Sequence, residues 1–204
     1  MPEPEKPFVK RAFALFLLFF CSLAPAAFAV VLDPHQIIRQ ELLNAGLTAL
    51  RDKAPDASKT GRLVIVDYAK HSREERLYVV NLKTGEVSAY RTSHGLGSDP
   101  DHDGYLDRFS SVPGSQASPR GTFRIAEEYR GKHGRSVRLD GLDEENRTAR
   151  DRAIVIHAAS YAEPEHLARY GKLGRSNGCI VFSKADLARF LDEVSEGTLI
   201  FVGK

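Results

Sequence analysis

The stretch RLVIVDYAKHSREERLYVVNLKTGEVSAYRTS, residues 62–93, decides the fold class. It contains three short runs rich in β-branched and aromatic residues, RLVIVDYA, ERLYVVNL and VSAYRTS, with turn-forming segments such as KTGE between them. Runs of this length and composition are typical of strands, and turn formers between them favour hairpin connections. We therefore predict three strands of an antiparallel meander.

More strands are predicted downstream of the meander. They are GTFRIAEEY (121–129), SVRLDGL (136–142), RAIVIH (152–157) and TLIFVG (198–203). The segment 95–121 is rich in Gly, Ser, Asp and Pro and is predicted to form long loops, which often carry function. The prevalence of strands predicts a mainly β fold, a mixed-sheet β-sandwich or rolled sheet with a few peripheral helices, rather than an α/β layer fold.

Three helices are predicted around these strands. An Asp-Pro pair at residues 33–34 is a typical helix start, and the stretch 35–54 that follows has apolar residues at near-helical spacing. PEHLARYG (164–171) is predicted to be a short helix. In SKADLARFLDEVSEG (183–197), Ser183 is predicted to cap the third helix.

The N-terminus has the composition of a secretory signal peptide. Three basic residues precede the apolar run AFALFLLFFCSLA, and Ala27 and Ala29 then form a small-x-small cleavage pattern. The run is short for a bilayer span and lacks a basic flank on its far side, so a retained membrane anchor is the less favoured alternative. Phe19 and Phe20 stand where a lipoprotein signal needs small residues before Cys21. We therefore expect cleavage after residues 1–29 and no permanent membrane anchor.

Length and net charge limit the number of domains and the classes of partner that fit the rest of the chain. The full sequence has 204 residues and a formal net charge of +2 at pH 7, which is too balanced to indicate nucleic-acid binding. Without the signal peptide the chain is long enough for a single hydrophobic core, and we expect one domain and a monomer.

GRSNGCIVF, residues 174–182, contains the one cysteine that remains after Cys21 leaves with the signal peptide. A single cysteine in an exported domain indicates a reactive thiol or an intermolecular partner, and the alternative is a buried structural thiol. A nucleophilic Cys179 needs a base. His157, at the end of the apolar run RAIVIH, is the candidate, because the turn and helix between them can return the chain to its side.

Other residues near Cys179 are candidates for binding roles. Gly178 has no β-carbon, so the backbone amides of Gly178 and Asn177 can point at a developing oxyanion. Ser176 adds a polar group for substrate binding. Tyr129 and His133 fall in a stretch that either lines the cleft or forms an ordinary turn.

Three motifs together resemble a known family. SPRGTF (118–123), IVIH (154–157) and SNGCIVF (176–182) are similar to the signature of the L,D-transpeptidase catalytic domain, the YkuD type. The longer stretches GLGSDPDHDGYLDRFSSVPG (95–114), YRGKHGRSVRLDGL (129–142) and RAIVIHAASY (152–161) resemble its divergent murein L,D-transpeptidase branch. The resemblance covers roughly residues 60–204. It implies an organisation of signal peptide (1–29), N-terminal helix and linker (30–58) and catalytic domain (59–204).

The resemblance implies a periplasmic enzyme of cell-wall biosynthesis that acts on peptidoglycan stem peptides without a cofactor. Cys179 would attack the carbonyl of an L-centre and form a thioester, and His157 would take the thiol proton and later that of the incoming amine. The resulting cross-link is open between the 3,3 and the 1,3 type.

The sequence departs from the family signature at three positions. Asn177 stands where a second histidine is usual, Val181 where Arg or Asn is common, and Ala158 where Gly is frequent. These changes leave the nucleophile and base in place but affect binding of the substrate carboxylate, for which Arg175 is the substitute cation. Two alternatives remain: a cysteine hydrolase on the same fold, either a carboxypeptidase or a cross-link-cleaving amidase, and a non-catalytic wall-binding module.

Metal sites are considered and set aside. In DPDHDGYLD (99–107), aspartates alternate as in the first part of an EF-hand loop, but Ser110 stands where the bidentate glutamate belongs, so a solvated acidic loop is favoured over calcium. His102, His133 and His166 match no short-range zinc pattern with His157. We therefore expect no metal.

Overall fold

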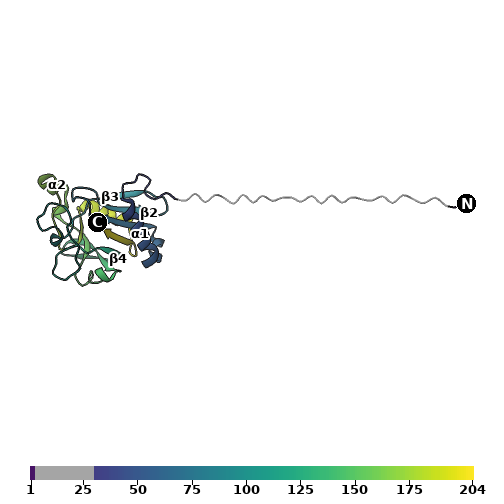
Figure 1. Ribbon diagram of the computed structural model, residues 1–204. Helices are drawn as coiled ribbons and strands as arrows, with labels where there is room; N and C mark the ends of the chain where they lie inside the picture. The colour runs from purple at the N-terminus through teal and green to yellow at the C-terminus, as the bar shows by residue number, and fades with distance from the viewer. Residues whose placement is uncertain (3–29) are drawn as a thin grey trace.

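The computed structural model describes residues 1–2 and 30–204 (Figure 1). The predicted signal peptide lies outside the described residues, apart from residues 1–2. In the described part of the chain, no helix combines the length and the apolar character that a bilayer crossing requires. The strands are β1 (Arg62–Asp67), β2 (Leu77–Asn81), β3 (Val87–Tyr90), β4 (Gly121–Gly131), β5 (Gly134–Gly141), β6 (Val155–Ala158), β7 (Ile180–Phe182) and β8 (Leu199–Gly203). The α-helices are α1 (Gln40–Lys53), α2 (Pro164–Tyr170) and α3 (Lys184–Glu193).

The strands form a single sheet in the order β3-β2-β1-β8-β4-β5-β6-β7. β1, β2 and β3 form the antiparallel meander predicted from residues 62–93. β8 pairs parallel with β1 and antiparallel with β4, and β7 pairs parallel with β6. The predicted mainly β, mixed-sheet fold with few helices is therefore confirmed. All eight strands belong to one continuous sheet, which curls so that its two ends face each other as two layers.

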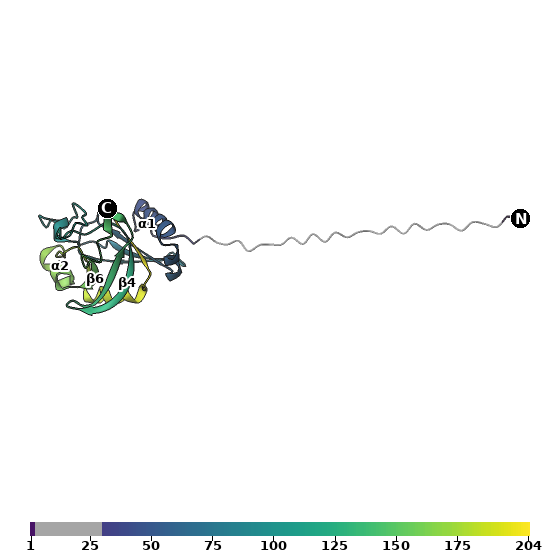
Figure 2. The ribbon, with the colours of Figure 1, turned by 90° about the horizontal axis from the view of Figure 1, so that it is seen from below.

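The inner face of the rolled sheet encloses the main core. Val64 of β1 and Ile156 of β6 belong to the same buried cluster although β8, β4 and β5 lie between these strands. Ile180 of β7 and Phe190 of α3 complete this cluster. In Figure 2 the curvature of the long β4 can be followed across the molecule. Since side chains alternate across a strand, the neighbours of these residues lie on the outer face.

Helix α1 covers the outer face at β1, β2 and β8. Leu43 and Leu50 of α1 share a second buried cluster with Leu63 and Ile65 of β1. Gly46 allows the close approach, because a β-carbon at this position would collide with the Ile65 side chain. This end of the sheet is therefore packed on both faces.

The start of α1 differs from the prediction. The helix begins at Gln40, not at the Asp-Pro pair 33–34. Asp33 and Gln36 have φ values of 53° and 54°, which a continuous right-handed helix excludes. The Asp33 carboxylate instead accepts the backbone N–H groups of Ile37 (3.0 Å) and Ile38 (2.8 Å), so it caps a separate turn ahead of the helix.

The two other predicted helices are confirmed. α2 spans Pro164–Tyr170, and none of its residues is fully buried. α3 begins after Ser183, whose hydroxyl accepts the N–H of Asp186 at 3.1 Å as predicted for a cap.

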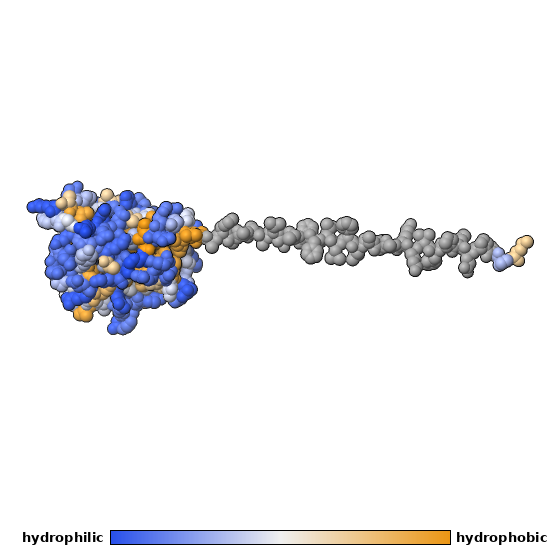
Figure 3. All heavy atoms as spheres, turned by 45° about the horizontal axis from the view of Figure 1, so that its top comes forward, coloured by the Kyte–Doolittle hydropathy of each residue, from blue (hydrophilic) through white to orange (hydrophobic). Residues whose placement is uncertain are grey.

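The surface of the domain is mostly hydrophilic, with an apolar area where the chain continues toward the N-terminus near Val31 (Figure 3).

The predicted loop segment 95–121 contains only one short 3-10 turn, Leu96–Ser98, ahead of β4. Internal hydrogen bonds nevertheless hold it in a defined shape. The Gly97 N–H donates to Gln116 O at 3.0 Å, and Ser118 Oγ accepts the Gly95 N–H at 3.0 Å. The same Ser118 hydroxyl donates to Gly178 O at 3.3 Å, which fastens this loop to the segment that carries Cys179.

Candidate active site

The parallel pairing of β6 and β7 brings Cys179 and His157 to one face of the sheet. Ile156 pairs with Ile180 and His157 with Val181, so Cys179 stands one residue before β7, opposite Val155. Ile156 and Ile180 face the main core. Because side chains alternate, His157 and Cys179 both point to the outer face, where they occupy diagonal positions on neighbouring strands.

Both side chains line a cleft of about 510 Å³ on this outer face. Of the residues predicted for the site, Tyr129, His133, Arg175, Ser176 and Asn177 line it too, whereas Gly178 does not. Sequence reasoning missed the other side chains of the cleft, which are Lys132, Arg152, Ala153, Val155 and Tyr161. They come from the β4–β5 hairpin, from β6 itself and from the segments before and after it, and no local motif marks them.

The hydrogen bonding of His157 suits it to be a base. Its Nδ1 lies 3.0 Å from the Ala158 carbonyl oxygen, which only a protonated nitrogen can approach as a donor. The neutral ring therefore carries its lone pair on Nε2. Burial lowers the pKa of His157, since only 3 % of the residue is exposed, and the nearby His133 and Lys132 lower it further. The imidazole is therefore neutral at pH 7 and able to accept a proton.

The Cys179 thiol is half-buried and protonated at rest. Its Sγ donates a hydrogen bond to Ala153 O at 3.6 Å. Burial raises the pKa of the thiol, and a backbone hydrogen bond from Val155 and the charges of Arg152 and Lys132 oppose that rise. Because the thiolate is the nucleophilic form, this cysteine needs a base to react at neutral pH.

The loop before Cys179 is held by its own hydrogen bonds. The Ser176 hydroxyl donates to Cys179 O at 2.9 Å and accepts the Gly178 N–H at 3.0 Å. Gly178 has φ 116°, and a β-carbon there would lie 2.6 Å from Ala117 O, so only glycine fits. The Gly178 N–H donates to Ser176 in this structure, so it would have to leave that partner to bind an oxyanion. The oxyanion role of Gly178 stays a prediction. Asn177 is exposed on the rim of the cleft, and its oxyanion role also stays a prediction.

The charges that line the cleft are all positive. They belong to Lys132, Arg152 and Arg175, and no aspartate or glutamate is among the lining residues. Arg152 donates to the backbone oxygens of Ser110 and Ala117, both at 2.8 Å, so its position is fixed without neutralising its charge. A cleft with these charges favours an anionic ligand.

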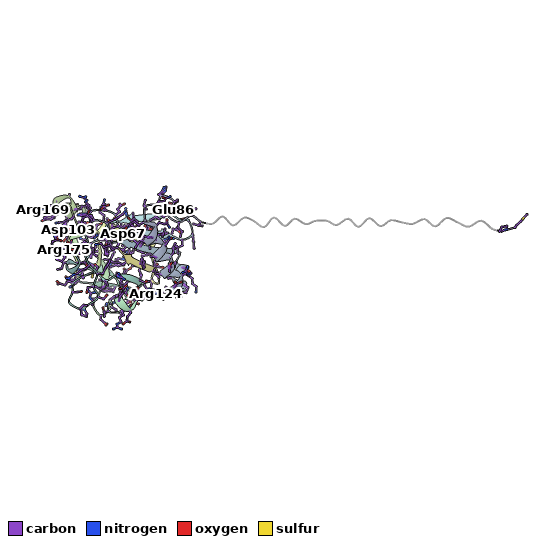
Figure 4. The ribbon with its side chains drawn as sticks, in the orientation of Figure 1. Asp67, Glu86, Asp103, Arg124, Arg169 and Arg175 are labelled. Carbon is purple, nitrogen blue, oxygen red and sulfur yellow. The ribbon has the colours of Figure 1, made fainter. Side chains whose placement is uncertain are left out.

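Arg175, the predicted substitute cation, is tied to the acidic loop. Its guanidinium donates to the carbonyl oxygens of Asp99 and Pro100, which leaves its remaining donors for a ligand. Figure 4 shows Arg175 and Asp103 at the same end of the molecule.

The acidic loop 99–107 has a structural explanation. Asp99 is fully buried, and its carboxylate accepts hydrogen bonds from the N–H groups of Asp103 (3.0 Å) and Gly104 (3.1 Å) and from His94 (2.9 Å). Asp101 and Asp103 are exposed. Asp99, Asp101 and Asp103 form the only group of three potential metal ligands among the described residues, and internal donors already satisfy Asp99.

Of the two alternatives for Tyr129 and His133, the structure shows that both line the cleft, and their role in substrate binding stays a prediction. The His133 ring stacks on the His157 ring with centroids 4.2 Å apart and planes 23° apart. The guanidinium of Arg138 lies over the Tyr129 ring, with its Cζ 4.6 Å from the ring centroid. The hairpin thus forms one wall of the cleft and covers the base.

The family model for the L,D-transpeptidase catalytic domain matches residues 34–202. No curated protein matches the chain. Among solved structures, the chain is similar to an L,D-transpeptidase from Mycobacterium smegmatis, with 20 % identity, 71 % of this chain and 59 % of that chain covered, and a TM-score of 0.42.

Two structures from Mycobacterium tuberculosis are also similar to the chain. One is an L,D-transpeptidase from strain H37Rv, with 16 % identity, 71 % and 58 % of the two chains covered, and a TM-score of 0.45. The other is L,D-transpeptidase 3, with 15 % identity, 71 % and 61 % covered, and the same TM-score. The chain thus spans 58 to 61 % of the length of these solved structures. Because the family model covers most of the sequence, the chain belongs to the L,D-transpeptidase catalytic domain family.

Proposed function

We propose that this protein is a periplasmic L,D-transpeptidase that cross-links peptidoglycan stem peptides through a thioester on Cys179, with His157 as general base. The observation that carries the proposal is the placement of a protonated thiol and a neutral imidazole on one face of β6 and β7, in a shared cationic cleft. The chemistry needs no cofactor.

The reaction has two halves. In the first, His157 Nε2 takes the thiol proton, and the sulfur forms a bond to the carbonyl carbon of the donor peptide. The carbon–nitrogen bond then breaks, the proton passes from His157 to the departing amine, and a thioester remains. In the second half, an acceptor amine loses its proton to His157 and attacks the thioester, which forms the new amide and returns the proton to the sulfur.

The charge of the cleft supports a stem peptide as donor. Such a peptide has free carboxylates beside the bond that is cleaved. Lys132, Arg152 and Arg175 offer three cationic donors without a competing carboxylate. Charge-assisted hydrogen bonds of this kind are stronger than neutral ones and orient a carboxylate when both oxygens are bound by one guanidinium.

A neighbouring hollow favours transfer over hydrolysis. It has a volume of about 420 Å³, shares Arg152 and Asn177 with the cleft, and is also lined by Gln116 and Asp151. The Asp151 side chain is exposed and is the only carboxylate of this hollow. It would attract the ammonium group of an acceptor, whereas a hydrolase needs room for water only.

Mass analysis of muropeptides tests the proposal. Purified protein incubated with tetrapeptide muropeptides is expected to release the terminal D-residue and to form dimers, and Cys179→Ala should abolish both products. Release of the D-residue with shortened monomers alone would identify a hydrolase. Absence of both products from the wild-type protein would favour a non-catalytic wall-binding module, and products that persist in Cys179→Ala would assign the nucleophile to another residue. The mass of the dimer fragments assigns the 3,3 or 1,3 linkage.

A separate variant tests the acceptor hollow. Asp151→Asn is expected to raise the acceptor concentration needed for half-maximal dimer formation while leaving release of the D-residue unchanged. Equal effects on dimer formation and on release of the D-residue would show that the acceptor does not bind in this hollow.

Trapping and localisation experiments complete the test. Intact-protein mass after incubation with a carbapenem is expected to rise by one covalent adduct, and Cys179→Ala should prevent it. Fractionation of cells that express the full chain should recover the protein in the periplasm with residues 1–29 removed. Recovery of the uncleaved chain with the membrane would instead support a retained anchor. Size-exclusion chromatography is expected to give a monomer.

A further inference from the structure

A cluster of three buried polar side chains lies directly behind the Cys179 loop. Arg76, His94 and Asp99 are each no more than 1 % exposed, and we refer to them together as the buried brace. Arg76 Nη2 donates to His94 Nδ1 at 2.9 Å, and His94 Nε2 lies 2.9 Å from Asp99 Oδ2. The brace thus connects the residue before β2 to the two ends of the segment 94–99.

The protonation state of the brace follows from its hydrogen bonds. A guanidinium can only donate, so His94 Nδ1 is the acceptor and the ring proton sits on Nε2, from which it is donated to Asp99. Burial and the charge of Arg76 lower the pKa of His94 to about 4, so the ring stays neutral. The three groups therefore form a directed chain, cation to neutral ring to anion.

The Arg76 guanidinium also binds backbone oxygens. Its Nε and Nη2 donate to Thr92 O at 3.0 and 2.8 Å, and its Nη1 donates to Lys70 O at 2.9 Å. A buried arginine satisfied in this way fixes the backbone that it touches. Here that backbone is the stretch from Thr92 onward, which runs beside β7 and the catalytic loop.

The segment that the brace holds is hydrogen-bonded to the catalytic loop. The Ser176 N–H donates to His94 O, and the Leu96 N–H donates to Ser176 O, both at 2.8 Å. Ser176 in turn binds Gly178 and Cys179 through its hydroxyl. A path of direct hydrogen bonds therefore runs from the His94 backbone to the residue that carries the thiol.

The brace also reaches the cleft by a second route. Asp99 accepts His94 with its carboxylate, and its carbonyl oxygen accepts a hydrogen bond from the guanidinium of Arg175. Arg175 lines the cleft. One buried group of residues is thus connected both to the nucleophile and to a cation for the ligand.

Stability alone does not account for the brace. Buried ion pairs contribute little net stability relative to well-packed apolar side chains of similar volume, and their best-attested benefit is a specific geometry. The apolar residues of the main core show that this fold can fill its interior without charges.

We propose that Arg76, His94 and Asp99 are positioning residues, which set the orientation of Cys179 toward His157 by holding segment 94–99 against the catalytic loop. The proposal rests on the proposed function in that Cys179 is the nucleophile. None of the three touches the ligand, because none lines the cleft.

Variants of His94 and Asp99 test the proposal. His94→Leu removes both side-chain hydrogen bonds of the ring. His94→Gln can place an amide N–H where Nε2 donates to Asp99, whereas His94→Asn places its polar atoms nearer to Nδ1. Asp99→Asn keeps the shape of the carboxylate but loses its charge. Val80→Ala is the matched control, since Val80 is equally buried but packs on the α1 side of the sheet.

Two readouts separate positioning from a merely structural role. The first is the rate of Cys179 alkylation by iodoacetamide as a function of pH, in which the sulfur forms a thioether and iodide leaves. It needs no substrate, and the groups that surround the thiol in the cleft, among them His157, His133, Lys132, Arg152, Arg175 and Tyr161, are unchanged in every variant. The second is KM together with kcat per active site, where the active sites are counted from the mass of the carbapenem adduct.

We expect His94→Leu and Asp99→Asn to lower kcat per active site at least tenfold, to change KM less than threefold, and to shift the pH midpoint of alkylation. His94→Gln should recover more of kcat than His94→Asn, which keeps the test valid if His94→Leu does not fold. Val80→Ala should lower Tm and leave both readouts at the wild-type values.

Folded brace variants with a lower Tm but wild-type kcat per site and wild-type alkylation profile would overturn the proposal. Failure of the proposed function would look different. In that case the wild-type protein would form neither adduct nor dimer. A shifted midpoint of alkylation in the brace variants would then still support positioning of Cys179, and an unshifted midpoint would overturn it.

Discussion

The outer face of the rolled sheet is used differently at its two ends. At β1, β2 and β8, helix α1 seals it with leucines, and the result is a second buried cluster. At β6 and β7 only a small cluster covers this face, in which Val181 packs with Ala162 and Leu173. The short α2 nearby has no fully buried residue, and the rest of the face borders the cleft with His157 and Cys179. Both ends follow the same alternation of side chains. The reactive groups therefore lie where the cover of the sheet is incomplete.

The largest effect is expected from His157→Gln at the open end. Glutamine keeps a polar side chain of similar size but cannot take the thiol proton, so the rate of D-residue release should fall by about 10²- to 10⁴-fold. Single-turnover acylation by a carbapenem, followed by mass, measures the loss. His35→Gln, a change at an exposed histidine outside the cleft, is the control and should react at the wild-type rate. A wild-type rate in His157→Gln would assign the base to another residue.

The next effect belongs to the covered end. Leu43 is 2 % exposed in the α1 cluster, so Leu43→Ala should lower the free energy of unfolding by about 2 to 5 kcal/mol. Urea unfolding measures this change. Val31→Ala, at a side chain that is largely exposed, should stay within about 0.5 kcal/mol of wild type. If the two ends are independent, kcat per folded site is unchanged in Leu43→Ala, and a fall in kcat would show that they are coupled.

A smaller effect is expected from Arg152→Met in the cleft. Loss of one charge-assisted hydrogen bond to a substrate carboxylate should raise KM about tenfold, and the salt dependence of KM should weaken. Arg152→Lys keeps the charge without the planar guanidinium, so its KM should lie between those of the wild type and Arg152→Met. Steady-state kinetics at two ionic strengths make the measurement. An unchanged KM in Arg152→Met would place the donor carboxylate elsewhere.

The smallest effect is a change of pH dependence in His133→Ala. Burial is the main reason for the lowered pKa of His157, and the charge of His133 adds to it. Removing the stacked ring exposes His157 and deletes this charge, so the pKa of His157 should rise toward its ordinary value. Since the base works when neutral, activity should be lost at a higher pH as the solution is acidified. A kcat/KM profile measures the acid limb, and a shift of that limb to lower pH would contradict this account.

Local patterns in the sequence account for the meander, the capped α3 and the pair Cys179 and His157. The meander and α3 depend on signals within a few residues, such as β-branched runs or Ser183 ahead of a helical stretch, and the pair depends on the cysteine count of the exported chain and on the motifs around each residue. Arg152 and Lys132 were missed because their importance depends on where distant loops meet. The start of α1 was misplaced since an Asp-Pro pair also caps an isolated turn, and only the backbone angles of Asp33 and Gln36 distinguish the two.

The acidic loop gives the same lesson for the site. Alternating aspartates are visible in the sequence, but the position of Asp99 beside His94 depends on the distant Arg76, which no spacing encodes. Gly178 was singled out for an open amide, whereas the structure requires glycine for its backbone angle and its proximity to Ala117. Composition identifies unusual positions more readily than it identifies the physical reason for them.

The position of β8 has a consequence for how the protein is made. This strand comes last in sequence order, yet it is the only strand that pairs with both β1 and β4, and so it joins β3–β2–β1 to β4–β5–β6–β7 in one sheet. A nascent chain still lacking residues 199–203 therefore lacks the strand that makes one sheet of the two halves. The continuous eight-stranded sheet forms only after this segment has been synthesised.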